Sequence, residues 1–147
     1  MSNNQFNFNN TYLTDISWIT LNKSGLIEDP NLILNNKAAI YIYQLKKDNS
    51  LIYIGSTSNI NMRIKQHSYC VNNRYIRCPE FYICVEKHGW NNFRLGILEY
   101  VNIPEINKDK REIKRIILNR EQYYLDILNP SLNKNKAVGS TLGYKHT

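Results

Sequence analysis

The chain has 147 residues, enough for one domain with a modest core. Its 19 Lys and Arg residues outnumber its 12 Asp and Glu residues, which gives a formal net charge of +7. Such an excess favours polyanionic partners, because Lys and Arg release condensed counterions when they neutralise phosphates. A solvated basic surface explains the charge as well. No segment approaches the ~20 continuous apolar residues that a membrane-spanning helix requires, so none is predicted.

The cysteines and the N-terminus indicate the cellular compartment in which the protein is expected. Cys70, Cys78 and Cys84 are odd in number and irregularly spaced, which argues against a disulfide framework and favours reduced cysteines inside a cell. A zinc site built from Cys78, Cys84 and His88 lacks the usual paired C-x-x-C and is disfavoured. Residues 1–10 resemble neither a secretory signal peptide nor a mitochondrial transit peptide.

The first 37 residues differ in character from the rest of the chain. They are rich in Asn and hold scattered apolar residues without a sustained period, which predicts a loosely structured N-terminal extension. One short helix is expected within it, beginning after Thr14 or Asp15, because either side chain can cap a helix.

Ordered structure is expected from Ala38. Residues 39–45 and 51–55 alternate β-branched and aromatic residues, and the polar segment 46–50 joins them. This pattern predicts a β-hairpin in which successive side chains point to opposite faces. Four isoleucines form the face that we expect to meet the core: Ile40, Ile42, Ile52 and Ile54. Three tyrosines form the face away from the core: Tyr41, Tyr43 and Tyr53.

The tyrosine face has two interpretations. Clustered phenols can present their hydroxyl groups to a reacting phosphate. Tyrosine is also common on half-exposed sheets, because its strand propensity is high. The tyrosines alone therefore do not specify a site.

A helix is predicted from about residue 59 to 69, with Ser58 as its cap. Arg63 and His67 are four residues apart in it and project from the same side. Arg offers a fork of donors that matches a phosphate group, and His exchanges a proton near neutral pH. The alternative is an ordinary solvated helix face.

A second helix is predicted over residues 80–87, and Gly89 is expected to end it. Residues 93–101 then show the pattern of a third strand.

The last predicted helix, residues 110–128, contains a carboxylate at an unusual position. Its apolar stripe includes Ile117 and Leu125, and Glu121 falls between them on the same side. A carboxylate that faces a core is costly unless it is paired or binds a metal. A salt bridge, for example to Arg63, is the alternative to a metal site.

Taken in order, these elements resemble the GIY-YIG nuclease family. The two signature triplets stand here as Ala39-Ile40-Tyr41 and Tyr53-Ile54-Gly55, with eleven residues, 42–52, between the tyrosines. Further matching segments follow in the family's order: Ser56 to His67, residues 78–93, residues 120–124 and Leu132-Asn133. The resemblance covers about residues 38–135. Ala39 replaces the first Gly of the signature, and Cys78 stands where relatives often carry Ser or Asn.

The resemblance implies an α+β fold, a small three-stranded antiparallel sheet flanked by helices, with residues 38–135 as the catalytic domain. It implies a DNA endonuclease that hydrolyses phosphodiester bonds in double-stranded DNA with one divalent ion, Mg²⁺ or Mn²⁺. No obligate protein partner is expected.

The resemblance also assigns roles to individual residues. Glu121 is expected to bind the metal and Arg63 to donate to the phosphate. Tyr41 is expected to be the general base, with help from His67 and Tyr53, although the two tyrosines can exchange roles. The supporting residues are expected to be Gly55, Ser56 and Asn133, and the DNA-binding residues Arg63, Lys65 and Lys87.

The last residues extend the resemblance. Residues 136–147 are similar to a linker and the first residues of the small DNA-binding modules that follow this domain in organellar intron-encoded proteins. We therefore expect a truncated homing endonuclease, and the AT-rich codon bias of Asn, Ile, Lys and Tyr suggests a mitochondrial gene. The alternatives are an inactive nucleic-acid-binding remnant and a repair or restriction nuclease of the same superfamily.

Overall fold

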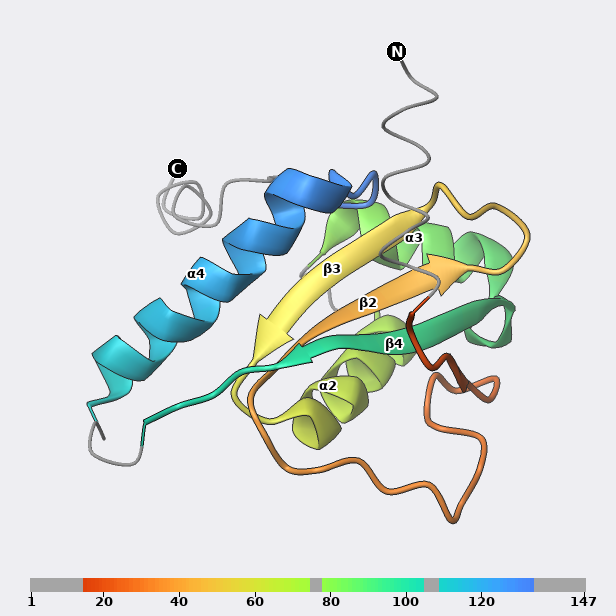
Figure 1. Ribbon diagram of the computed structural model, residues 1–147. Helices are drawn as coiled ribbons and strands as arrows, with labels where there is room; N and C mark the ends of the chain where they lie inside the picture. The colour runs from red at the N-terminus through yellow and green to blue at the C-terminus, as the bar shows by residue number, and fades with distance from the viewer. Residues whose placement is uncertain (1–14, 75–77, 105–108, 134–147) are drawn as a thin grey trace.

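The computed structural model describes residues 15–74, 78–104 and 109–133 (Figure 1). It has the α+β architecture that the sequence predicted, an antiparallel sheet flanked by helices. In chain order the elements are β1 (Ile19–Thr20), β2 (Ala39–Leu45), β3 (Ile52–Thr57), α2 (Ile60–Asn72), α3 (Pro79–His88), the 3₁₀ turn η1 (Trp90–Asn92), β4 (Phe93–Tyr100) and α4 (Lys110–Leu128).

The sheet has four strands in the order β1-β4-β2-β3, and all neighbours are antiparallel. The predicted hairpin is present as β2 and β3, with Tyr41 opposite Gly55 and Tyr43 opposite Tyr53. The prediction of three strands was one too few, because Ile19 and Thr20 pair with the outer edge of β4. A two-residue strand gives no periodic signal in a sequence, so only the fold reveals it.

The N-terminal segment is better ordered than the sequence predicted. Residues 15–37 contain β1 and a turn, and no helix follows Asp15. Leu21 is 1% exposed in the core, and the backbone carbonyl of Ser24 accepts a hydrogen bond from the Ser68 hydroxyl on α2 at 2.6 Å. Gly25 has a φ of 90° and lies so close to the Trp90 ring that a Cβ atom would overlap it. This segment therefore packs against the domain.

Both faces of the sheet are covered. In Figure 1, α4 lies along one side of the sheet, and α2 and α3 lie behind it. The isoleucine face is buried in the core, as predicted, and it packs against α4 through Ile117 and Leu125. The tyrosine face was expected to point away from the core, and that prediction was wrong, because Tyr41 and Tyr43 are 0% exposed beneath α2 and α3.

The three helices predicted after residue 38 are present with small changes at their ends. Asn59, not Ser58, caps α2, and its side chain accepts a hydrogen bond from the backbone amide of Met62 at 3.2 Å. Helix α3 begins at Pro79, a favoured first position, and ends at Gly89, which has a φ of 89°. Helix α4 has the predicted bounds.

The chain beyond α4 lies on the free edge of β3. The backbone amide of Leu132 donates to the carbonyl of Ile52 at 2.9 Å, which covers part of an edge that would otherwise be open to another strand. The predicted tail module, residues 136–147, lies outside the described residues, and so do residues 1–14 of the predicted extension.

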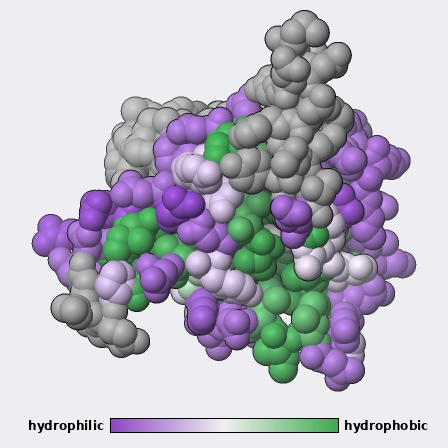
Figure 2. All heavy atoms as spheres, in the orientation of Figure 1, coloured by the Kyte–Doolittle hydropathy of each residue, from purple (hydrophilic) through white to green (hydrophobic). Residues whose placement is uncertain are grey.

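The surface of the described residues is mainly polar. Figure 2 shows apolar side chains between α4 and β4 and over the loop that precedes β2. Leu26, Leu32 and Ile33 are the exposed large apolar residues of that loop. None of the described helices combines the length and the hydropathy needed to cross a bilayer.

Candidate active site

The position of Tyr41 depends on a glycine. Tyr41 and Gly55 are opposite each other on β2 and β3, and a Cβ atom at Gly55 would overlap the hydroxyl and Cζ of the Tyr41 ring. The ring therefore crosses the backbone of β3 because no side chain is there. The register shift between Ile40 and Tyr41, where β2 meets β4, lies at the same place, and such bulges reorient a side chain.

Substitution of Gly55 tests this placement. Gly55→Ala is expected to displace the Tyr41 hydroxyl, and a misplacement of about 1 Å at a reacting group typically costs about 10²-fold in rate. Single-turnover DNA cleavage measures the loss. Gly96→Ala is the matched control, because its added methyl group would overlap Ile16 on the other face of the sheet. If Gly55→Ala and Gly96→Ala reduced cleavage equally, overpacking rather than displacement of Tyr41 would be the cause.

The Tyr41 side chain on β2 contacts helix α2. Its hydroxyl lies 2.7 Å from Nε2 of His67, and both residues are buried. Burial raises the pKa of the Tyr41 phenol above its usual value of about 10, and the Arg63 guanidinium opposes that rise through its charge and a hydrogen bond. Tyr41 is therefore a neutral phenol at neutral pH, with a cation and an imidazole as its neighbours.

Arg63 and His67 do project from the same side of α2, but they differ in exposure. His67 is 3% exposed, whereas Arg63 is half-buried. The Arg63 guanidinium donates to the backbone carbonyl of Ser56 at 3.2 Å and to the Gln66 side chain at 2.8 Å. These bonds fix the guanidinium at the rim of the site, where a phosphate can approach it.

Tyr53 lies beside Tyr41, with 6.4 Å between the ring centroids. Its ring stacks on Phe81 of α3 at 4.4 Å, and its hydroxyl is 3.3 Å from the sulfur of Cys78. Burial raises the pKa of the Tyr53 phenol as well. The thiol of Cys78 therefore provides a polar contact for the Tyr53 hydroxyl.

Glu121 approaches the same group of residues from α4. Its carboxylate accepts a hydrogen bond from the Ser56 hydroxyl on β3. Burial raises the pKa of the Glu121 carboxyl, and the Ser56 bond and the Arg63 charge oppose that rise. No ion pair of Glu121 occurs within residues 15–74, 78–104 and 109–133, so the salt bridge considered as an alternative is not present there.

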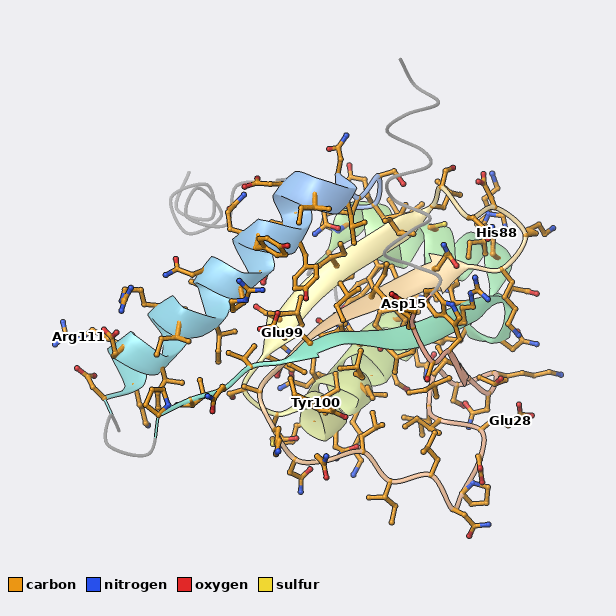
Figure 3. All side chains as sticks on the ribbon, in the orientation of Figure 1. Asp15, Glu28, His88, Glu99, Tyr100 and Arg111 are labelled. Atoms are coloured by element: carbon orange, nitrogen blue, oxygen red, sulfur yellow. The ribbon has the colours of Figure 1, made fainter. Side chains whose placement is uncertain are left out.

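A second acidic residue nearby is already paired. Glu99, labelled in Figure 3 at the end of β4, accepts hydrogen bonds from Arg120 at 2.7 Å and from the Tyr124 hydroxyl at 2.9 Å. The first of these bonds is the main reason that the pKa of Glu99 is lowered. Arg120 is thus paired with Glu99. It does not neutralise Glu121, the next residue in the sequence, which can therefore bind another cation.

The donor set of the site fits a hard divalent ion. Mg²⁺ keeps several waters and commonly takes one or two carboxylates together with phosphate oxygens, and Glu121 offers one such carboxylate. Zinc would require three or four ligands, and the described chain gathers no group of three His, Cys, Asp or Glu side chains. Cys78 and His88 flank α3 at opposite ends, about 15 Å apart for a helix of this length.

The other predicted residues are placed as follows. Asn133 pairs with the backbone of Ile54, accepting from its amide at 2.9 Å and donating to its carbonyl at 2.8 Å, so it extends the edge of β3. Lys65 is exposed on the outer side of α2, and Lys87 is exposed near the end of α3, where its charge acts on Cys84. The structure does not bring either lysine into the tyrosine cluster.

Two residues at the site were missed by the sequence prediction. The Tyr82 hydroxyl lies 2.8 Å from Nδ1 of His67, and Gln66 binds Arg63. Tyr82 belongs to the buried face of a short helix, where an aromatic residue is ordinary, and nothing in its spacing relates it to His67. The spacing of Gln66 from Arg63, three residues along a helix, was a usable signal.

Comparisons with known proteins identify the family of the chain. The model of the GIY-YIG catalytic domain matches residues 37–136. The catalytic domain of homing endonuclease I-TevI is 27% identical, with a TM-score of 0.52, and the match covers 66% of this chain and 94% of that one. A mutant of the catalytic domain of intron endonuclease I-TevI is 24% identical, with a TM-score of 0.53, and the match covers 66% and 89%. Because the family model spans most of the chain, the protein belongs to the GIY-YIG catalytic domain family.

Proposed function

We propose that this nuclease domain is a DNA endonuclease that hydrolyses phosphodiester bonds with one divalent ion, Mg²⁺ or Mn²⁺. The observation that carries the proposal is the convergence of Glu121, Arg63 and Tyr41 from three different elements. The half-buried Glu121 carboxylate is held by Ser56, and the Arg63 charge acts on both Glu121 and Tyr41. Together, a carboxylate, a fixed guanidinium and a phenol can bind a divalent ion, bind a phosphate and transfer a proton.

Each group has a distinct task in this mechanism. Glu121 holds the divalent ion, which when bound stabilises the leaving 3′-oxygen and the charge on the phosphate. Arg63 donates to the phosphate oxygens as their charge grows. Tyr41 accepts the proton of the attacking water, and Tyr53 orients the water or the phenol beside it. Ser56 keeps the carboxylate in place through its hydroxyl.

Tyr41 cannot act as a pre-formed phenolate, because burial keeps it protonated. It can accept a proton from water only while it passes its own proton to another base. His67 Nε2, 2.7 Å away, is that base in our proposal.

We further propose that the substrate is double-stranded DNA and that the chain is of the intron-encoded homing type. Two features support this: the likeness to the catalytic domain of I-TevI, described as a homing and an intron endonuclease, and the similarity of residues 136–147 to the start of a DNA-binding module. The abundance of Asn, Ile, Lys and Tyr supports a mitochondrial location, as part of the same proposal. No protein partner is required by the proposed chemistry.

The test is cleavage of end-labelled duplex DNA with Mg²⁺, with Mn²⁺ and with excess EDTA. The proposal predicts products with 3′-hydroxyl and 5′-phosphate ends in either metal and none in EDTA. Cleavage that continues in EDTA would contradict the proposal. DNA binding without cleavage in any metal would favour an inactive nucleic-acid-binding remnant.

A further inference from the structure

His67 is enclosed by two tyrosine hydroxyls, and this arrangement determines where its proton lies. Nε2 is 2.7 Å from the Tyr41 hydroxyl, and Nδ1 is 2.8 Å from the Tyr82 hydroxyl. A neutral imidazole has one donor nitrogen and one acceptor nitrogen, whereas a phenol can fill either role. These two distances alone are therefore compatible with both tautomers.

Arg63 removes that ambiguity. The guanidinium has only donors. It is held by the carbonyl of Ser56, next to the glycine over which the Tyr41 hydroxyl lies, and its charge acts on that hydroxyl. The lone pairs of the Tyr41 oxygen are therefore favoured on the side of Arg63, and the O–H is favoured on the other side. That O–H needs an acceptor, because Tyr41 is 0% exposed and an unpaired buried hydroxyl is costly. Nε2 of His67 lies in that direction.

If Nε2 accepts, then Nδ1 carries the proton and must donate. Its partner is the Tyr82 hydroxyl, which accepts at 2.8 Å. The proton of Tyr82 can in turn point towards Cys70, whose thiol acts on the Tyr82 phenol. Tyr82 and Cys70 both line a pocket of about 290 Å³ between α2 and α3.

We propose that Tyr82 is a positioning residue that holds His67 in the Nδ1–H tautomer and thereby makes Nε2 available to Tyr41. This inference rests on the proposed function and adds a residue to it. When Tyr41 accepts the proton of the attacking water, the original O–H bond of Tyr41 breaks and an Nε2–H bond forms. The hydroxide attacks phosphorus, and His67 becomes an imidazolium whose Nδ1–H remains bonded to Tyr82.

Substitution of Tyr82 with Phe removes the acceptor and keeps the ring that packs against His67, 5.7 Å between centroids. The variant loses the hydroxyl that accepts from Nδ1–H in the native chain, so the Nε2–H tautomer becomes more favourable. That tautomer cannot accept the Tyr41 proton. We expect Tyr82→Phe to slow single-turnover cleavage about 10-fold, the effect of losing roughly one hydrogen bond in the reacting state, with DNA affinity unchanged.

The direct test is long-range ¹H–¹⁵N NMR of the histidine rings in the metal-free protein, which requires no activity. The chain has three histidines, and His67→Gln identifies the signal of His67. We expect a protonated Nδ1 and an unprotonated Nε2 in the native chain, and a shift towards Nε2–H in Tyr82→Phe. A protonated Nε2 in the native chain, or an unchanged tautomer in Tyr82→Phe, would overturn the inference.

The kinetic arm has a matched control. Tyr100→Phe removes a phenol hydroxyl from a residue that is 37% exposed at the end of β4, and it is expected to leave cleavage and tautomer unchanged. An equal loss in both variants would overturn the role of Tyr82. If the native chain does not cleave DNA, the proposed function fails, whereas the NMR result on the native chain still decides the tautomer.

Discussion

Replacing Glu121 with Gln is expected to reduce DNA cleavage at least ~10³-fold, because a catalytic metal supplies several kcal/mol of stabilisation to the reacting phosphate. Gln can still accept the hydrogen bond from Ser56, so the fold is retained. The measurement is single-turnover cleavage of a labelled duplex in Mg²⁺. DNA binding in EDTA should change little, and this separates loss of chemistry from loss of substrate.

The same substitution is expected to stabilise the metal-free protein. Burial raises the pKa of the Glu121 carboxyl in the folded state, so ionisation is more costly in the folded chain than in the unfolded one. This destabilisation exists above the folded pKa and disappears as the pH falls below the unfolded pKa. In EDTA at neutral pH, Glu121→Gln should therefore have the higher Tm, and the difference should shrink at acidic pH.

The outcomes for Glu121 distinguish a metal ligand from a structural carboxylate. A buried metal ligand lowers the stability of the metal-free protein and is required for activity. Its replacement should therefore raise the Tm in EDTA and lower the cleavage rate. If Glu121→Gln lowered the Tm in EDTA and left cleavage within a few-fold of the native rate, the carboxylate would be structural and the metal site would lie elsewhere.

Replacing Tyr41 with Phe is expected to reduce cleavage by about 10²–10⁴-fold, the usual contribution of a general base. Phe keeps the ring that crosses Gly55 and loses only the hydroxyl that contacts His67. DNA affinity should be retained, because Arg63 and the basic surface are unchanged. Single-turnover cleavage at saturating protein measures the loss.

Tyr43→Phe is the control for Tyr41, since Tyr43 lies two residues along β2 on the same face and is equally buried. Its hydroxyl has no hydrogen-bond partner within the part of the chain that the structure describes, so its removal should preserve cleavage and leave the Tm equal or higher. Loss of activity in Tyr43→Phe but not in Tyr41→Phe would show that Tyr41 is not the general base.

The sequence predicted the elements that have a strong local period. The hairpin of β2 and β3 and the bounds of α4 were correct, because alternation over seven residues and an apolar stripe over nineteen leave few alternatives. Strand β1 was missed because its two residues are defined only by pairing with β4. The tyrosine face was misjudged because one strand cannot reveal that α2 and α3 cover its second side.

The site was predictable only in part, for physical reasons. Residue spacing was enough to propose Glu121 as a candidate, since a carboxylate within an apolar stripe is costly and needs a partner. The need for glycine at position 55 is visible only once the Tyr41 ring is seen across it. Tyr82 could not be identified, because its contact with His67 joins two helices through side-chain packing.

The central claim is that Glu121 and its neighbours form one metal-dependent active site for DNA. The most direct measurement is conversion of supercoiled plasmid to nicked and linear forms, with Mg²⁺ or EDTA, by the native chain and by Glu121→Gln side by side. We predict conversion by the native chain in Mg²⁺ alone. Equal conversion by Glu121→Gln, or conversion by the native chain in EDTA, would contradict it.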